Sequence, residues 1–123
     1  MKIKNRLRQW VERRFFGRIE YMEIKEFQKM CADVVDKIDK KYGIERDPQL
    51  AFTQLMEEIG ELARDINLKR LRRKEPDKEN LSGEFADVFL QLAMLAEMHN
   101  IDLEEAIENK IKKLKERGYL EEK

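Results

Sequence analysis

Four acidic residues have the type and the spacing that binding of a divalent cation requires. They form two pairs, Glu58 with Glu61 and Glu84 with Asp87, and the members of each pair are three residues apart. Residues at this spacing lie on the same face of a helix, so each pair would present two carboxylates side by side. If the two helices pack together, the four carboxylates converge, and their repulsion would force some of them to take up protons.

A divalent cation resolves this repulsion better than protonation does. Sites made only of carboxylate oxygens suit Mg²⁺ or Mn²⁺ rather than Zn²⁺, and Mg²⁺ commonly binds a few carboxylates together with the phosphates of a substrate. Four carboxylates would balance a pair of Mg²⁺ ions about 3.5–4 Å apart. The sequence leaves one alternative open, in which Glu58 and Glu61 belong to a solvated helix face.

The second acidic pair lies on a stretch that is apolar almost all the way round. This stretch, residues 84–98, reads EFADVFLQLAMLAEM. It is too short to cross a bilayer, which takes roughly 20 apolar residues, so we expect it to be buried in protein, where an ionised carboxylate needs a partner or a metal. Gln91 continues the stripe of Glu84 and Asp87, either as a hydrogen-bond partner of the site or as a polar position at the edge of an interface.

Apolar residues at helical spacing predict three further helices. Their expected limits are residues 21–42 with Gly43 as the stop, the Asp47-Pro48 cap to about Lys69, and Asp102 to Gly118. The charged stretch 67–82 between them reads as a loop, with Asn80 or Ser82 as the cap of the next helix. The sequence therefore predicts an all-α protein, an antiparallel four-helix bundle with an additional N-terminal amphipathic helix or arm.

Charge divides the chain into an arm, residues 1–21, and a helical domain, residues 22–123. The whole chain has 26 basic and 26 acidic residues, whereas the arm has an excess of basic side chains. The favoured interpretation is that the arm packs on the domain or on a dimer partner. The alternative is a basic helix that lies on nucleic acid or on an anionic membrane.

Other features narrow the class of protein. A single cysteine, Cys31, excludes an internal disulfide and fits a reducing compartment, and the N-terminus lacks the apolar core of a signal peptide, so we expect a cytoplasmic protein. The chain has no phosphate-binding glycine loop and no CxxC motif. His99, the one histidine, does not stand three residues after a glutamate, as the ligand set of di-iron bundles requires. We expect no membrane span and no nucleic-acid partner.

Taken together, these motifs resemble those of the MazG-like, all-α nucleoside triphosphate pyrophosphohydrolases. That family carries an EExxE motif followed by an ExxD motif. Here they read Glu57-Glu58-Ile59-Gly60-Glu61 and Glu84-Phe85-Ala86-Asp87, and the likeness extends over roughly residues 22–118.

The resemblance implies hydrolysis of a nucleoside triphosphate to the monophosphate and pyrophosphate, with Mg²⁺ or alternatively Mn²⁺, by a homodimer or homotetramer. It implies that the four paired acids bind the metal and that Glu57, with Glu58, positions or activates water. Substrate-binding roles are assigned to Lys110, Lys113, Arg117 and Gln91. Leu114 stands where the family has an asparagine, which is a departure in the region of sugar or phosphate recognition. The alternative function is a non-catalytic, oligomeric binding or regulatory module of the same fold.

Overall fold

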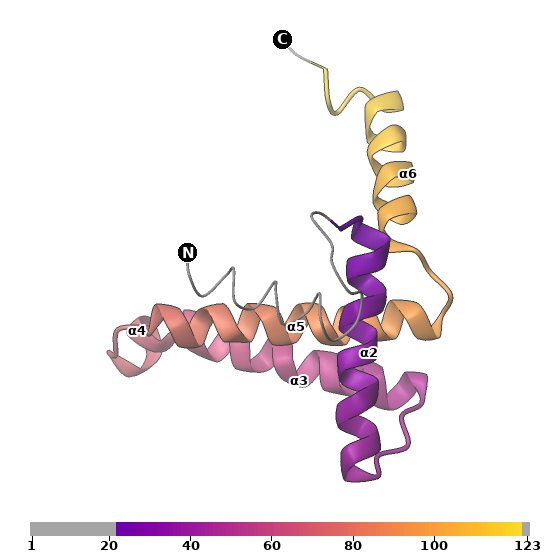
Figure 1. Cartoon of the computed structure of the whole chain (residues 1–123). Helices are drawn as coiled ribbons and strands as arrows, with labels where there is room; N and C mark the ends of the chain where they lie inside the picture. The colour runs from indigo at the N-terminus through magenta and orange to yellow at the C-terminus, as the bar shows by residue number, and fades with distance from the viewer. Residues whose placement is uncertain (1–21, 122–123) are drawn as a thin grey trace.

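The computed structural model describes residues 22–121, which form helices and no strand (Figure 1). The helices are α2 (Ile24–Tyr42), α3 (Pro48–Ile66), α4 (Leu68–Arg72), α5 (Lys78–Met98) and α6 (Leu103–Glu116). The predicted all-α class is confirmed. The predicted basic arm, residues 1–21, lies outside the described residues.

Helix α5 is the element against which the others pack. Helix α3 runs antiparallel beside it, and α2 crosses the pair (Figure 1). The buried apolar side chains come from all three helices and are mostly small: Cys31, Ala32, Val35, Ala51, Leu55, Ala93 and Ala96. Within the described residues, no helix combines the length and the apolarity needed to cross a membrane.

Three helix boundaries lie where the sequence predicts them. Gly43 ends α2 in a left-handed conformation with φ of 66°, which glycine adopts without steric cost. Asp47 begins α3 by accepting a hydrogen bond of 2.8 Å from the backbone N–H of Leu50. Asp102 begins α6 in the same way, with 2.9 Å to the N–H of Glu104. Local capping chemistry therefore determines these ends.

The predicted loop over residues 67–82 is wrong over most of its length. Helix α4 occupies its first part, and α5 begins before its end, where Asp77 accepts a hydrogen bond of 3.0 Å from the N–H of Glu79. Asn80 and Ser82 consequently lie inside α5 and are not its caps. Lysine, arginine and glutamate are good helix formers, so the high charge here marks exposure to water and not irregular backbone.

Helix α3 also ends earlier than predicted, at Ile66 rather than near Lys69. Asn67 separates it from α4, and its side-chain amide donates a hydrogen bond of 2.8 Å to the carbonyl of Ala63. Helix α4 has only five residues, and Arg73, the C-cap that follows it, has a φ of 55°.

Helix α6 packs on α2 and extends away from the α3–α5 pair (Figure 1). The buried side chain of Gln28 on α2 fixes the start of α6. Its amide nitrogen donates to the carbonyl of Ile101 at 2.7 Å, and its amide oxygen accepts from the N–H of Leu103 at 2.8 Å. Residues 22–121 leave the apolar stripe of α6 largely uncovered, since Ile107 is 57% exposed and Ile111 is 49% exposed.

The prediction that the stretch 84–98 is buried holds for only part of it. Ala93 and Ala96, toward the end of α5, are buried against the neighbouring helices, whereas Phe85, in the first half of α5, is 55% exposed. Exposed apolar side chains also occur on α3, where they include Phe52, Met56 and Ile59. The described part of the chain therefore leaves much of the apolar surface of α3, α5 and α6 exposed.

Candidate metal centre

Helices α3 and α5 bring three of the predicted ligands together. One carboxylate oxygen from each of Glu58, Glu84 and Asp87 lies within 4.8 Å of the other two. Glu58 comes from the middle of α3, and the other two come from the first half of α5. The antiparallel packing of these helices is what places the two acidic pairs face to face.

Two oxygens of this cluster have no hydrogen-bond partner. They are Oε2 of Glu58 and Oε2 of Glu84, and each is buried without a donor among the described residues. A buried, charged oxygen that lacks a partner is costly, and structures normally supply one. Since carboxylate oxygens are the ligands that Mg²⁺ and Mn²⁺ prefer, these residues fit a divalent cation of that kind.

The same crowding alters the acidity of the two glutamates. Burial raises the pKa of Glu58 above its ordinary value, and the negative charges of Asp87 and Glu61 raise it further. Burial also raises the pKa of Glu84, followed by the charges of Glu61 and Asp65. Both carboxyl groups therefore resist ionisation, and a cation among them would act in the opposite direction.

The other predicted acids lie at the margin of the cluster. Glu61 and Glu57 are exposed residues of α3 and are not members of the close group of three. Glu61 is still near enough for its charge to act on Glu58 and Glu84. The roles of Glu61 as a ligand and of Glu57 in handling water remain predictions.

A polar contact that the sequence did not suggest lies beyond Glu61. The side-chain amide of Asn80 on α5 donates a hydrogen bond of 2.8 Å to Oδ2 of Asp65 on α3. Asp65 stands four residues after Glu61, and Asn80 stands four residues before Glu84. Four-residue spacing keeps Asp65 on the helix face of Glu61 and Asn80 on the face of Glu84, and this spacing could have indicated the contact.

A second polar group, centred on Arg46, lies on the opposite side of the cluster. Its guanidinium contacts both carboxylate oxygens of Asp39, with Nε at 2.6 Å from Oδ2 and Nη2 at 2.9 Å from Oδ1. Nη2 also donates to Oε1 of Gln54 at 2.8 Å, and Nη1 donates to Oε1 of Gln91 at 3.2 Å. Gln91 is thus bonded to protein, and its predicted contact with substrate remains a prediction. Sequence reasoning missed Arg46, which lies in a loop outside every motif.

The predicted basic residues do not reach the acidic cluster within one chain. Lys110 and Lys113 lie on α6, and Arg117 is its C-terminal cap. All three are exposed, and their helix packs on α2 rather than on the α3–α5 pair. Their predicted part in substrate binding stays a prediction.

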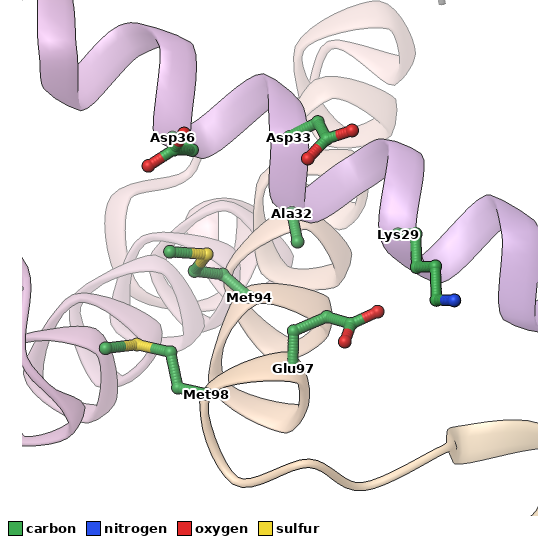
Figure 2. Close-up of a pocket in the computed structure, with 7 residues that line it drawn as sticks. All are labelled: Lys29, Ala32, Asp33, Asp36, Met94, Glu97 and Met98. Atoms are coloured by element: carbon green, nitrogen blue, oxygen red, sulfur yellow. The ribbon is translucent and has the colours of Figure 1, made fainter. Parts of the chain in front are cut away.

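Two hollows in the surface differ in their relation to the acids. The hollow beside the cluster has a volume of about 330 Å³ and is lined by Asp77, Glu79, Asn80, Gly83, Glu84 and Asp87. A larger one of about 390 Å³ lies between α2 and α5, where Lys29, Ala32, Asp33 and Asp36 face Met94, Glu97 and Met98 (Figure 2). This second hollow is at the C-terminal end of α5, so it is separate from the acidic cluster.

Comparison with known proteins agrees with the resemblance drawn from the acidic motifs. The family model of the MazG nucleotide pyrophosphohydrolase domain matches residues 46–118. The uncharacterized protein YvdC of Bacillus subtilis (strain 168) is 33% identical over an alignment of 88 residues, and the match covers 64% of this chain and 83% of that protein. The uncharacterized protein YpjD of the same organism is 31% identical over an alignment of 85 residues, and the match covers 63% of this chain and 77% of that protein. No solved structure gives a significant match.

The matched residues include both acidic pairs and the two helices that carry them. They also make up more than half of the chain. This chain therefore belongs to the MazG nucleotide pyrophosphohydrolase family.

Proposed function

We propose that this protein is a Mg²⁺-dependent nucleoside triphosphate pyrophosphohydrolase that releases a nucleoside monophosphate and pyrophosphate. The observation that carries the proposal is the pair of unpartnered, buried oxygens of Glu58 and Glu84 beside Asp87. Membership of the family supports a nucleotide as the substrate. We treat residues 22–123 as the catalytic domain and the cytoplasm as its compartment.

The residues of the cluster would bind the metal and leave one side open for phosphate. Glu58, Glu84 and Asp87 would hold Mg²⁺, or alternatively Mn²⁺, with Glu61 as the fourth ligand. When bound, the ion neutralises the charge of the triphosphate and makes water more acidic. The hollow of about 330 Å³ next to Glu84 and Asp87 is the space in which the phosphates would lie.

The exposed Glu57 is proposed to orient the attacking water and to accept its proton. The water oxygen forms a bond to the α-phosphorus, in line with the bond from that phosphorus to the oxygen that bridges to the β-phosphorus. This second bond breaks, and its electron pair leaves with pyrophosphate. No covalent enzyme intermediate is needed, so the protein acts by positioning and by electrostatics.

Basic side chains would stabilise the departing pyrophosphate. Lys110, Lys113 and Arg117 are our candidates, together with Gln91 as a contact to the nucleotide. Because α6 packs away from α3 and α5 in its own chain, these side chains would serve the site of a second copy.

A homodimer or homotetramer follows from the same argument. The apolar stripe of α6, with Ile107 and Ile111 about half exposed, would pack on the exposed apolar side chains of α3 and α5 in another copy. Such packing would complete a four-helix bundle from two chains. The basic arm, residues 1–21, would pack at that interface.

An assay of pyrophosphate release tests the activity. Purified protein is given a panel of canonical and modified nucleoside triphosphates with Mg²⁺, with Mn²⁺, or with a chelator. We expect release from at least one nucleotide, only when metal is present, and with the monophosphate as the other product. Absence of release from every nucleotide would favour the non-catalytic binding module.

A further inference from the structure

We propose that Arg46 is a positioning residue for the acidic centre, because it sets the spacing and the register of α3 and α5. It contacts none of the carboxylates of the centre and acts through Gln54 and Gln91. The inference rests on the proposed metal centre, but it concerns residues that lie outside that centre.

One guanidinium joins three helices. Arg46 lies in the connection between α2 and α3, and its side chain is only 5% exposed. It bonds Asp39 in the last turn of α2, Gln54 on α3 and Gln91 on α5. The planar fork of an arginine holds its partners in fixed directions, so these contacts restrict how α3 and α5 can slide past each other.

The two glutamines are next to the acids on their helices. Gln54 is four residues before Glu58, and Gln91 is four residues after Asp87. Because α3 and α5 are antiparallel, both glutamines lie on the same side of the cluster, about one helical turn of 5.4 Å from it. A shared hydrogen-bond partner at that level fixes the separation of the helices where the carboxylates must meet.

Asp39 neutralises the charge of Arg46, so this charge has little effect on the carboxylates of the centre. Asp39 is also only 5% exposed and bonds the guanidinium through both of its oxygens. A buried guanidinium without such a partner would be costly. With Asp39 in place, the group adds no net charge, so the centre keeps the negative charge that a cation needs.

The contact between Asn80 and Asp65 also joins α3 and α5, on the opposite side of the centre, but it differs from the Arg46 group. It is a single hydrogen bond in an exposed position, whereas the Arg46 group is buried and has four contacts. Exposed polar contacts contribute little to rigidity, since water competes for both partners. The Arg46 group is therefore the one that determines the geometry of the centre.

The test replaces both buried charged partners with apolar residues of similar size, by combining Arg46→Met with Asp39→Leu. Such a replacement removes the network without leaving a charge unpaired, so the fold is retained. The matched control combines Lys40→Met with Asp36→Leu, which removes an exposed ion pair of 2.9 Å from the same helix. Circular dichroism and thermal unfolding establish that all proteins are folded.

The first measurement is the affinity of the full chain for Mn²⁺, from the spin-resonance signal of the free ion. We expect about tenfold weaker binding without Arg46, the range found when residues that orient metal ligands are lost, and no change in the control. Gln91→Met alone should also weaken Mn²⁺ binding. In the variant that already lacks Arg46, Gln91→Met should cause no further loss of affinity. Equal affinity of the wild-type protein and the Arg46 variant would overturn the inference.

The second measurement needs no metal. It is the distance between two spin labels, attached at Thr53→Cys on α3 and at Ser82→Cys on α5, which are about 15 Å apart along the helix axes. Labelled chains are diluted with unlabelled ones so that only distances within one chain are measured. Cys31 does not interfere, since it is 2% exposed and burial raises its pKa to about 11. We expect a broader distance distribution without Arg46, and an unchanged distribution would contradict its positioning role.

Failure of the proposed metal centre and failure of the positioning role of Arg46 would give different results. A wild-type protein that binds no Mn²⁺ would overturn the proposed metal centre, and the distance measurement would still decide whether Arg46 sets the helix spacing. A protein that binds Mn²⁺ with the same affinity and the same distances after loss of Arg46 would overturn only the positioning role.

Discussion

Glu58 and Glu84 each keep a carboxylate oxygen away from water with no donor to bind it. Such an arrangement lowers the stability of the folded chain when no cation is present. Proteins tolerate local costs of this kind mainly at functional sites, where other parts of the structure compensate. This cost supports the proposal that the carboxylate cluster binds a cation.

The first prediction concerns pH. The pKa of Glu58 is raised above 4.5 in the folded chain, so the folded state takes up a proton more readily than the unfolded state. Below pH 4.5 the side chain is protonated in both states and does not reduce the free energy of unfolding. As pH rises through the raised pKa, the side chain ionises in the folded chain and the free energy of unfolding falls. Without metal, we expect Glu58→Gln to be more stable than the wild-type protein at pH 8, with the difference vanishing toward pH 4.5.

Urea unfolding in the presence of a chelator, repeated across this pH range, measures that difference. Addition of Mg²⁺ should reverse its sign at pH 8, because only the wild-type protein gains from the bound ion. A wild-type protein that is the more stable of the two at pH 8 without metal would contradict the assignment.

The second prediction concerns Asp87. Asp87→Asn keeps the size of the side chain and removes its charge, so we expect helical content to be unchanged. We expect the rate of pyrophosphate release to fall by at least about 100-fold, because loss of a residue that only orients a metal ligand already costs up to about that much. The matched control is Glu108→Gln on the exposed part of α6, which should leave turnover as it was. Full activity of Asp87→Asn would remove this residue from the metal site.

At the scale of the helices, the features that could be predicted from the sequence are those that depend on residues close together in the chain. Asp47, Gly43 and Asp102 delimit helices because caps act on their own backbone. The acidic pairs could be recognised because their spacing within each helix is visible in the sequence. Arg46 could not, because its contacts join a loop to three helices and depend on the final packing.

The third prediction concerns the placement of α6. Gln28→Leu would leave the carbonyl of Ile101 and the N–H of Leu103 without their partner. We expect a loss of about 1–3 kcal/mol of stability and faster hydrogen exchange in the first turn of α6. Gln49→Leu, on an exposed position of α3, is the matched control and should change neither quantity. Unaltered exchange in the Gln28 variant would show that another contact positions α6.

At the scale of the whole molecule, the exposed apolar surface is the main departure from a self-sufficient domain. The helices were predictable from the sequence, but the exposure of their apolar faces was not, because an apolar stripe has the same pattern whether or not another element covers it. Phe85 and Ile107, both more than half exposed, lie on faces that the periodicity alone would place in a core.

The fourth prediction tests whether a second copy covers these faces. Ile107→Asp combined with Ile111→Asp introduces charge into the apolar stripe of α6, and we expect it to reduce the mass in solution to that of the 14.9 kDa chain. The control combines Asn109→Asp with Lys112→Asp on the polar side of the same helix and should leave the assembly intact. Sedimentation equilibrium measures both, and a wild-type protein that is already monomeric would contradict the proposed assembly.

The most direct measurement of the central claim is a crystal structure of the full chain with Mn²⁺ and a non-hydrolysable nucleoside triphosphate analogue. Anomalous diffraction locates manganese independently of any model of the site. We predict a peak among the carboxylates of Glu58, Glu84 and Asp87, in contact with phosphate oxygens of the analogue. Manganese bound elsewhere, with these three side chains separated and facing solvent, would contradict the account.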